Sequence, residues 1–341
     1  MTARLRFVIA LLGAVLAWPA GGSAQTVEQF YKGKPLTMIV GGGYDVYARA
    51  FARHLSKHIP GHPNIVAKNV PAAGGLTAAN MLYTTAEKDG STIAAFPNNV
   101  PMDALLENPG ARYDALKFNW LGSIGKLQNV CASWHTSPVK TIEAARAREV
   151  IVAAAGAASN TAIMPKVLNA LLGTRFKVIT GYDPGSGLTL SIERGEAEGI
   201  CGLSWSTMKA SRPHWIRERL LNVIVQMGLQ KLADLPDVPA ALDLVSDRDS
   251  RQVLELILMR QEPGRPFAAP PGTPADRVAA LRQAFEETLK DPEFVAEVDR
   301  LQLEIEPLTG AQIDSLLAKA ASAPAPIVRR AIELLAPPGR K

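Results

Sequence analysis

Short apolar runs alternate with amphipathic stretches along most of the chain, and the runs have the length of buried β-strands. The first run is Leu36–Val40, and the stretch behind it repeats apolar residues every four positions. That spacing predicts a helix with one buried face. Its apolar residues are Tyr47, Phe51, Leu55 and Ile59. Pro60-Gly61 ends the pattern, because both residues disfavour a helix interior.

The same order of strand and then helix recurs along the chain. Helices are expected to end near Tyr83, Leu172 and Arg194, and a late helix covers Ala275–Leu289. This alternation predicts an α/β fold built from mainly parallel sheets covered by helices. The further strands are expected at residues 64–69, 91–96, 130–134, 149–154, 176–179, 199–203 and 221–227.

Length and composition indicate two lobes. The chain has 341 residues, of which 47% are hydrophobic and 20% charged, so it can bury more than one core. A second set of elements begins near Gly125. The last 60 or so residues are too few for a third core, so we expect them to pack back on the first lobe.

The N-terminus has the pattern of a secretory signal peptide. Arg4 and Arg6 precede the apolar run Phe7–Trp18, and Gly22-Ser23-Ala24 supplies the small residues of a cleavage site. We predict that residues 1–24 are removed after Ala24. The alternative is a membrane anchor, which needs about 18 or more apolar residues in a row, longer than this run.

Export changes how the charge and the cysteines of this chain are interpreted. Loss of the two arginines lowers the formal net charge from +5 to +3, without a basic block, so no nucleic-acid partner is expected. In an oxidising compartment Cys131 and Cys201 could form a disulfide if they lie on neighbouring strands of one lobe. The alternative is a pair of buried free thiols. Cys201 lies in an apolar strand, which argues against a reactive nucleophile.

Two glycine-rich or small-residue corners follow predicted strands and open predicted helices. Gly41-Gly42-Gly43-Tyr44-Asp45 follows the first strand, and Gly156–Thr161 follows a strand of the second set. Such corners let the backbone approach a ligand, and the helix N-terminus attracts an anion. Either corner could also be only structural, since any α/β fold needs such turns.

Five motifs in this order resemble the tripartite tricarboxylate transporter receptors, the Bug family. They are the corner GGGYD, the turn PAAGG, the loop GYDPGSG, the connector LPDVP and the helix start APPGTP, and they span about residues 31–317. The resemblance implies a type II periplasmic binding fold with a ligand cleft between two lobes. It places residues 25–124 and 265–341 in lobe 1 and residues 125–264 in lobe 2.

The resemblance also implies a function and a site. The protein would be a monomeric periplasmic receptor without a cofactor that passes a small carboxylate, such as a di- or tricarboxylate or an acidic amino acid, to membrane transporter components. The first jaw would contain Gly42, Gly43, Tyr44, Asp45, Ala73 and Gly74, and the second Ser159, Asn160, Thr161, Tyr182 and Gly185. Asp45 would cap amides of the corner, because a free carboxylate repels the ligand. Trp205 follows a strand end and could line the cleft or pack in the core.

Two other function classes remain open. An exported enzyme acting on a small organic acid would consume its ligand, although no G-x-S-x-G or nucleotide-binding motif is present. A receptor that only senses the ligand has the same sequence pattern. His54 and His58 lie four apart as zinc ligands could, but the sequence near them supplies no carboxylate or cysteine, and we expect a solvated helix face and no metal.

Overall fold

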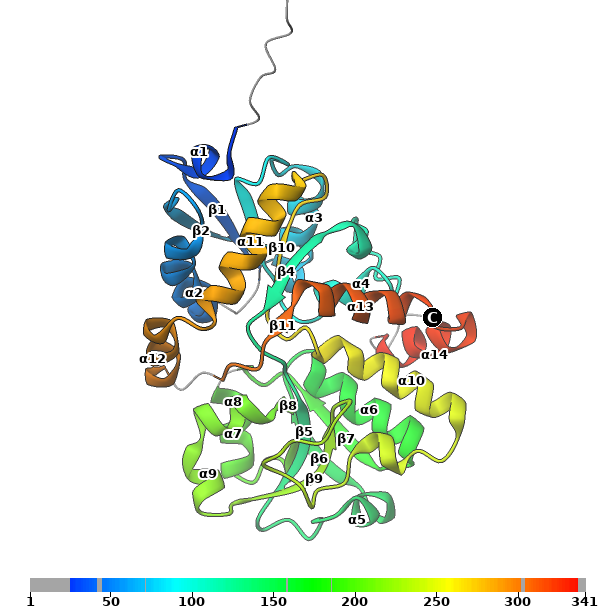
Figure 1. Cartoon of the computed structure of the whole chain (residues 1–341). Helices are drawn as coiled ribbons and strands as arrows, with labels where there is room; N and C mark the ends of the chain where they lie inside the picture. Colours follow the sequence, from blue (N-terminus) through cyan, green and yellow to red (C-terminus); the bar gives the residue numbers. More distant parts are fainter. Residues whose placement is uncertain are drawn as a thin grey trace, which may run out of the picture.

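The computed structural model describes residues 25–41, 45–70, 72–157, 159–184, 186–301 and 304–336. The predicted signal peptide, residues 1–24, lies outside them. The described residues form two lobes, each a β-sheet with helices packed on it, seen one above the other in Figure 1.

The first lobe contains a six-stranded sheet in the order β11-β4-β10-β3-β1-β2. β1 pairs in parallel with β2 and β3, whereas β10 runs antiparallel between β3 and β4. The chain therefore leaves this lobe after β4 and re-enters it through β10. The strands are β1 (Leu36–Val40), β2 (Ile65–Asn69), β3 (Thr92–Ala95), β4 (Asn119–Ser123), β10 (Pro266–Ala269) and β11 (Leu308–Thr309).

The second lobe repeats this plan with a five-stranded sheet in the order β7-β6-β8-β5-β9. β6 is parallel to β7 and β8, and β5 runs antiparallel between β8 and β9. β5 is the strand through which the chain enters this lobe. The strands are β5 (Asn129–Trp134), β6 (Val150–Ala154), β7 (Phe176–Thr180), β8 (Gly199–Ser204) and β9 (Leu221–Met227).

Helices cover both faces of each sheet. In the first lobe α2 packs on α11 and α12, and α13 packs on β4 from the other side. The first-lobe helices are α1 (Val27–Tyr31), α2 (Asp45–His58), α3 (Leu76–Thr84), α4 (Val100–Asp103), α11 (Ala275–Thr288), α12 (Pro292–Arg300) and α13 (Gly310–Ala321). The second lobe carries α5 (Ile142–Ala147), α6 (Asn160–Leu172), α7 (Ser186–Glu193), α8 (Trp205–Ser211), α9 (Pro213–Arg217) and α10 (Arg248–Leu258).

Aromatic packing fixes the position of α2, the helix predicted to follow the first strand. Phe51 of α2 is fully buried, and its ring centroid lies 4.9 Å from that of Phe267, 4.7 Å from Phe285 and 5.4 Å from Phe294. Such tilted and edge-on pairs contribute about 0.5–1.5 kcal/mol each beyond their buried area. Sequence spacing predicts the apolar face of α2, but it does not show that the partners come from the end of the chain.

The prediction of mainly parallel sheets needs a correction. Both sheets are mixed, because β10 and β5 cross from one lobe to the other and enter the sheets antiparallel. The sequence analysis also missed β4, β10 and β11 as strands. β10 spans only Pro266–Ala269, and the prolines around it are typical of a connector, so its sequence does not identify it as a strand. It is a strand because it pairs with β3 on one side and β4 on the other.

Two crossing segments join the lobes and pack against each other. Ile124 N–H donates to the Arg265 carbonyl over 3.3 Å, and Leu127 N–H donates to the Gln261 carbonyl over 3.2 Å. Gly264 has φ +45°, and a Cβ on it would collide with the Gly125 carbonyl oxygen. Both the left-handed conformation and the contact therefore require glycine.

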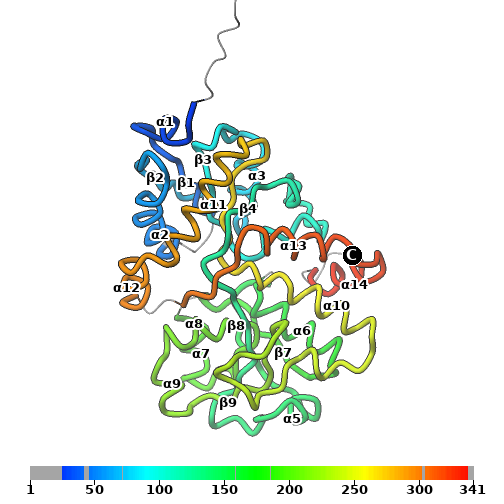
Figure 2. The backbone as a smooth tube through the Cα atoms, viewed as in Figure 1, coloured from blue at the N-terminus to red at the C-terminus, as the bar shows by residue number. Residues whose placement is uncertain are grey.

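The C-terminal helix α14 (Ala325–Leu335) does not follow the expectation that the chain end packs on the first lobe. It contacts α10 and α6, which belong to the second sheet's layer. Figure 2 shows the tube of α14 beside α10, near the end of the chain. Ile327 and Ala331 are its buried residues. These two residues belong to a core cluster that contains apolar side chains of both lobes.

Cys131 and Cys201 are joined by a disulfide. They are direct partners in the register of β5 and β8, within one lobe, and both are buried. The bridge fastens the strand that enters the second lobe to the central strand of its sheet.

We expect the Gly264→Ala substitution to lower the free energy of unfolding by at least about 3 kcal/mol, because it adds an atomic overlap to the left-handed backbone. Gly33→Ala is the matched control, because Gly33 is also left-handed at φ +75° but a Cβ there meets nothing within 4 Å. The control should lose only about 1–2 kcal/mol in urea unfolding. Equal losses at the two positions would mean that the crossing is not tightly packed.

We expect reduction of the disulfide to lower the free energy of unfolding by about 2–4 kcal/mol, because the bridge closes a loop with a sequence separation of 70 residues. The buried bridge should be reduced in urea and the protein refolded under reductant before measurement. The double variant Cys131→Ala, Cys201→Ala is the control, and reductant should not change its unfolding curve. An identical response of wild type and control would show that no bridge forms.

Candidate ligand site between the lobes

The ends of the parallel strands in both sheets meet at the crossing. Phe96, directly after β3, donates its N–H to the Pro266 carbonyl over 2.9 Å, and Trp205, directly after β8, donates to the Gln128 carbonyl over 2.9 Å. Pro266 and Gln128 lie next to the two crossing segments. The loops after β1, β2 and β3 therefore lie on the same side of their sheet as the crossing, as do those after β6, β7 and β8. Ligands of open α/β sheets bind at this edge.

Part of the predicted first jaw lies outside the described residues. Gly42, Gly43 and Tyr44 are not described, and of Asp45 only the backbone is, as the first residue of α2. Gly41 donates its N–H to the Ala95 carbonyl over 2.9 Å, and a Cβ on it would lie 2.9 Å from the Cβ of Ala78. Close packing of the corner on α3 thus explains the first glycine.

The second turn of the first lobe is exposed and left-handed. Ala73 has φ 53° and Gly74 φ 61°, and both residues are exposed. Asn99, in the loop after β3, donates its side-chain N–H to the Gly74 carbonyl over 3.2 Å. This contact brings the loops after β2 and β3 together at the sheet edge.

The second-lobe corner satisfies its own hydroxyl groups. Thr161 is 5% exposed, and its Oγ1 accepts the Ala155 N–H over 3.1 Å and lies 2.9 Å from the Ser159 hydroxyl oxygen. Asn160 is the half-buried first residue of α6. Thr161 therefore holds the corner in shape. Gly185 lies outside the described residues.

Two predicted aromatic residues are packed on the second-lobe core. Tyr182 is half-buried, and Trp205 is 5% exposed. Trp205 Nε1 donates to the Asp234 carboxylate over 3.1 Å. Trp205 also lines a cavity of about 730 Å³ between α8 and the segment 304–306.

A smaller pocket of about 300 Å³ contains residues that the sequence analysis missed. Its walls come from α2, from α8 and from the crossing, so it lies between the lobes. It shares Ser206 and Glu304 with the larger cavity. The lining residues are Tyr47, Ser206, Thr207, Ala210, Ser211, Arg265 and Glu304.

Arg265 is the main charged group of this pocket. Its side chain is largely buried, at 6% exposure for the residue, and its guanidinium carbon lies 3.7 Å from the centroid of the Tyr47 ring. This stacking orients the cation, and burial strengthens its field. Only a weak sequence signal marks these two residues as part of a binding site. Tyr47 fits an apolar helix face, and Arg265 is a lone arginine after Pro263-Gly264.

The acidic group in the wall of this pocket, Glu304, is paired with a lysine. Glu304 lies 2.6 Å from Lys209 Nζ, and Lys209 also pairs with Asp234. Burial alone would lower the pKa of Lys209, but hydrogen bonds to Asp234 and Glu304 outweigh it and raise that pKa. Burial raises the pKa of Tyr47, so its phenol stays neutral. The pocket wall therefore combines a cation, hydroxyl groups and a paired acid.

The expected solvated face of α2 is wrong for His54, which is 8% exposed. Carboxylates that sequence reasoning did not find do reach this helix. Asp291, Glu293 and Glu297 come from the start and body of α12, more than 200 residues later in the chain.

Within the described residues, the helices of the structure are too short or too polar to span a membrane.

One curated relative and several solved structures match this chain. A UPF0065 protein of Bordetella bronchiseptica is 26% identical over 295 residues, which cover 83% of this chain and 80% of the relative. No protein-family model matches.

Three solved structures share the fold. A TctC solute binding protein from Polaromonas superposes with a TM-score of 0.68 at 20% identity, covering 89% of this chain and 98% of that one. The periplasmic binding protein BugD gives 0.59 at 20% identity, with coverage of 89% and 97%. MatC from Rhodopseudomonas palustris with bound malate gives 0.59 at 20% identity, with coverage of 89% and 99%.

The α/β fold predicted from the alternation of elements, and the two lobes predicted from length and composition, are confirmed. The resemblance predicted from the motifs is confirmed as well: this chain is similar in fold to the TctC solute binding protein and to the periplasmic binding protein BugD, and similar in sequence to the UPF0065 protein.

Proposed function

We propose that this chain is a periplasmic solute-binding receptor that holds a small carboxylate between its lobes for a tripartite tricarboxylate-type membrane transporter. The observation that carries the proposal is the buried Arg265 guanidinium in a pocket between the lobes, beside the hydroxyl groups of Ser206, Thr207 and Ser211. A guanidinium binds a carboxylate through two parallel hydrogen bonds.

Size and chemistry support a small ligand. A pocket of about 300 Å³ is at the lower end of the range for small-molecule sites. MatC, which has the same fold, holds malate, a dicarboxylate. One carboxylate of such a ligand would bind Arg265, and the other would reach the corners that contain Gly42, Gly43, Ala73 and Gly74 on one side and Asn160 and Gly185 on the other.

The proposed receptor has two lobes, formed by different parts of the chain, and a cleaved export signal. Residues 25–124 and 265–324 would form lobe 1 and residues 125–264 lobe 2, with α14 attached to lobe 2. A ligand that contacts both lobes favours the closed arrangement by its extra affinity for that state. Residues 1–24 would direct export and be cleaved after Ala24, and the receptor would release its ligand unchanged, without acting as an enzyme.

We expect the mature chain, from Gln25, to bind at least one acid in a thermal-shift screen of dicarboxylates, tricarboxylates, acidic amino acids and aromatic acids. A ligand at 100 times its Kd adds about 2.7 kcal/mol to the free energy of unfolding. Calorimetry should then give a stoichiometry of one. Recovery of the same compound after prolonged incubation distinguishes a receptor from an enzyme.

Ala210→Glu and Ala210→Gln form a matched pair that tests the pocket. Ala210 is exposed on α8 and lines the pocket, so either side chain fits without burial. The glutamate should weaken binding about tenfold more than the glutamine, because it repels an anion across a few ångströms. Arg265→Met should abolish binding. Equal effects of the Ala210 variants, or full binding by Arg265→Met, would contradict an anion site here.

A further inference from the structure

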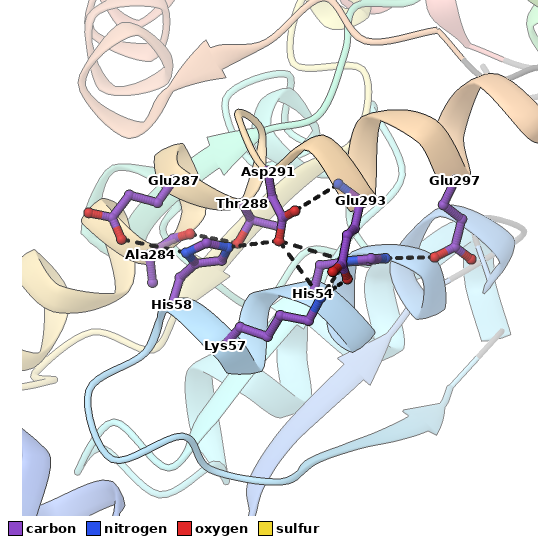
Figure 3. Close-up of polar contacts among 9 residues, drawn as sticks. All are labelled: His54, Lys57, His58, Ala284, Glu287, Thr288, Asp291, Glu293 and Glu297. Carbon is purple, nitrogen blue, oxygen red and sulfur yellow. Dashed lines mark hydrogen bonds and ion pairs between the residues drawn. The ribbon is translucent and has the colours of Figure 1, made fainter.

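A second cluster of chemically active side chains joins α2 to α12, on the first lobe and apart from the pocket between the lobes (Figure 3). His54 lies on α2, Asp291 precedes α12, and Glu293 lies in its first turn. In the described part of the chain, one donor atom from each of these three residues lies within 4.8 Å of the others. The proposed receptor function does not use them.

The hydrogen bonds of His54 leave one ring nitrogen directed at this cluster. Nε2 lies 2.7 Å from Glu297 Oε2, which fixes Nε2–H as the donor to that carboxylate. Arg53 forms an ion pair with the other oxygen of Glu297, so this carboxylate lies between a guanidinium and the His54 ring and accepts from both. In the neutral imidazole an Nε2–H donor leaves the lone pair on Nδ1, the nitrogen that lies 3.4 Å from Lys57 Nζ. A carboxylate on the far nitrogen is the usual support of a metal-binding histidine.

The two carboxylate oxygens of Asp291 make different contacts. Oδ1 caps α12 by accepting the Glu293 N–H over 2.8 Å. Oδ2 faces the histidines, at 3.9 Å from His54 Nδ1 and 3.1 Å from His58 Nε2. His58 thereby orients Asp291, whose side chain is only 10% exposed. The second oxygen is held in place for a cation.

In this structure the Lys57 ammonium lies among the three groups that could bind a metal ion. Its Nζ is 3.4 Å from His54 Nδ1 and 3.9 Å from Asp291 Oδ2, and it is paired with Glu293. The Lys57 side chain is 45% exposed and that of Glu293 74%, so both can move without disturbing the core. The cluster thus already surrounds a positive charge, which an exposed side chain supplies.

We propose that His54 Nδ1, Asp291 Oδ2 and the Glu293 carboxylate form a binding site for Zn²⁺ or a similar transition-metal ion, which enters by displacing the Lys57 ammonium. An imidazole nitrogen with two carboxylate oxygens suits zinc, whereas Mg²⁺ and Ca²⁺ favour oxygen ligands alone. Water would complete the coordination on the exposed side, next to Glu293. The bound ion would link α2 to α12.

Calorimetry with zinc chloride on the EDTA-treated mature chain tests the site. We expect one ion to bind per chain, and Lys57→Met to bind at least tenfold more tightly, because no ammonium has to leave. Glu293→Gln should weaken binding at least tenfold, and this exposed residue can be changed without unfolding the protein. Glu297→Gln should weaken it about 10–100-fold, as is usual for the supporting partner of a histidine ligand.

His54→Ala should abolish binding, and His135→Ala, which removes an exposed histidine of the second lobe, should leave it unchanged. Thermal unfolding without zinc shows whether each variant is folded. Absence of stoichiometric binding in both wild type and Lys57→Met would overturn the proposal. So would zinc affinity in Lys57→Met no higher than in wild type, or in Glu293→Gln equal to wild type.

Discussion

The contact between the two crossing segments is the constraint on which the rest of the structure depends. Gly264 has no Cβ, so its backbone can lie against the Gly125 carbonyl while φ is +45°. This contact fixes where the chain passes between the lobes. It also sets the direction in which β5 and β10 enter their sheets, and hence the mixed pairing of both sheets.

The crossing brings the functional edges of the two sheets together. The strand ends after β3 and β8 bond to residues next to the crossing, so the carboxyl ends of the parallel strands of both sheets lie on the side of the crossing. Arg265 follows Gly264 directly, which places a buried cation in the wall of the pocket between α2 and α8. The same glycine that allows the crossing therefore positions the charge that we assign to ligand capture.

The later part of the chain ties the two lobes and their helices together. α11 and α12 return to α2, where Phe285 and Phe294 pack on Phe51 and the carboxylates of α12 reach His54. The segment 304–306 then bonds to the crossing at Ile124, and α14 ends on α6 and α10. Because α13 packs on β4 of the first lobe and α14 packs on α10 and α6, the end of the chain limits how far the lobes can separate.

Local pattern alone determined much of this protein. The four-residue spacing of α2, the turn after β2, most strands and the possibility of a disulfide could be predicted, because periodicity and turn chemistry act over a few residues. Only the tertiary structure decided what those faces meet. Arg265 against Tyr47, α14 on the second lobe, and His54 beside Glu297, 243 positions away, are contacts between residues distant in sequence. A sequence pattern shows which side chains are buried or charged, but their partners follow from the path of the chain through the crossing.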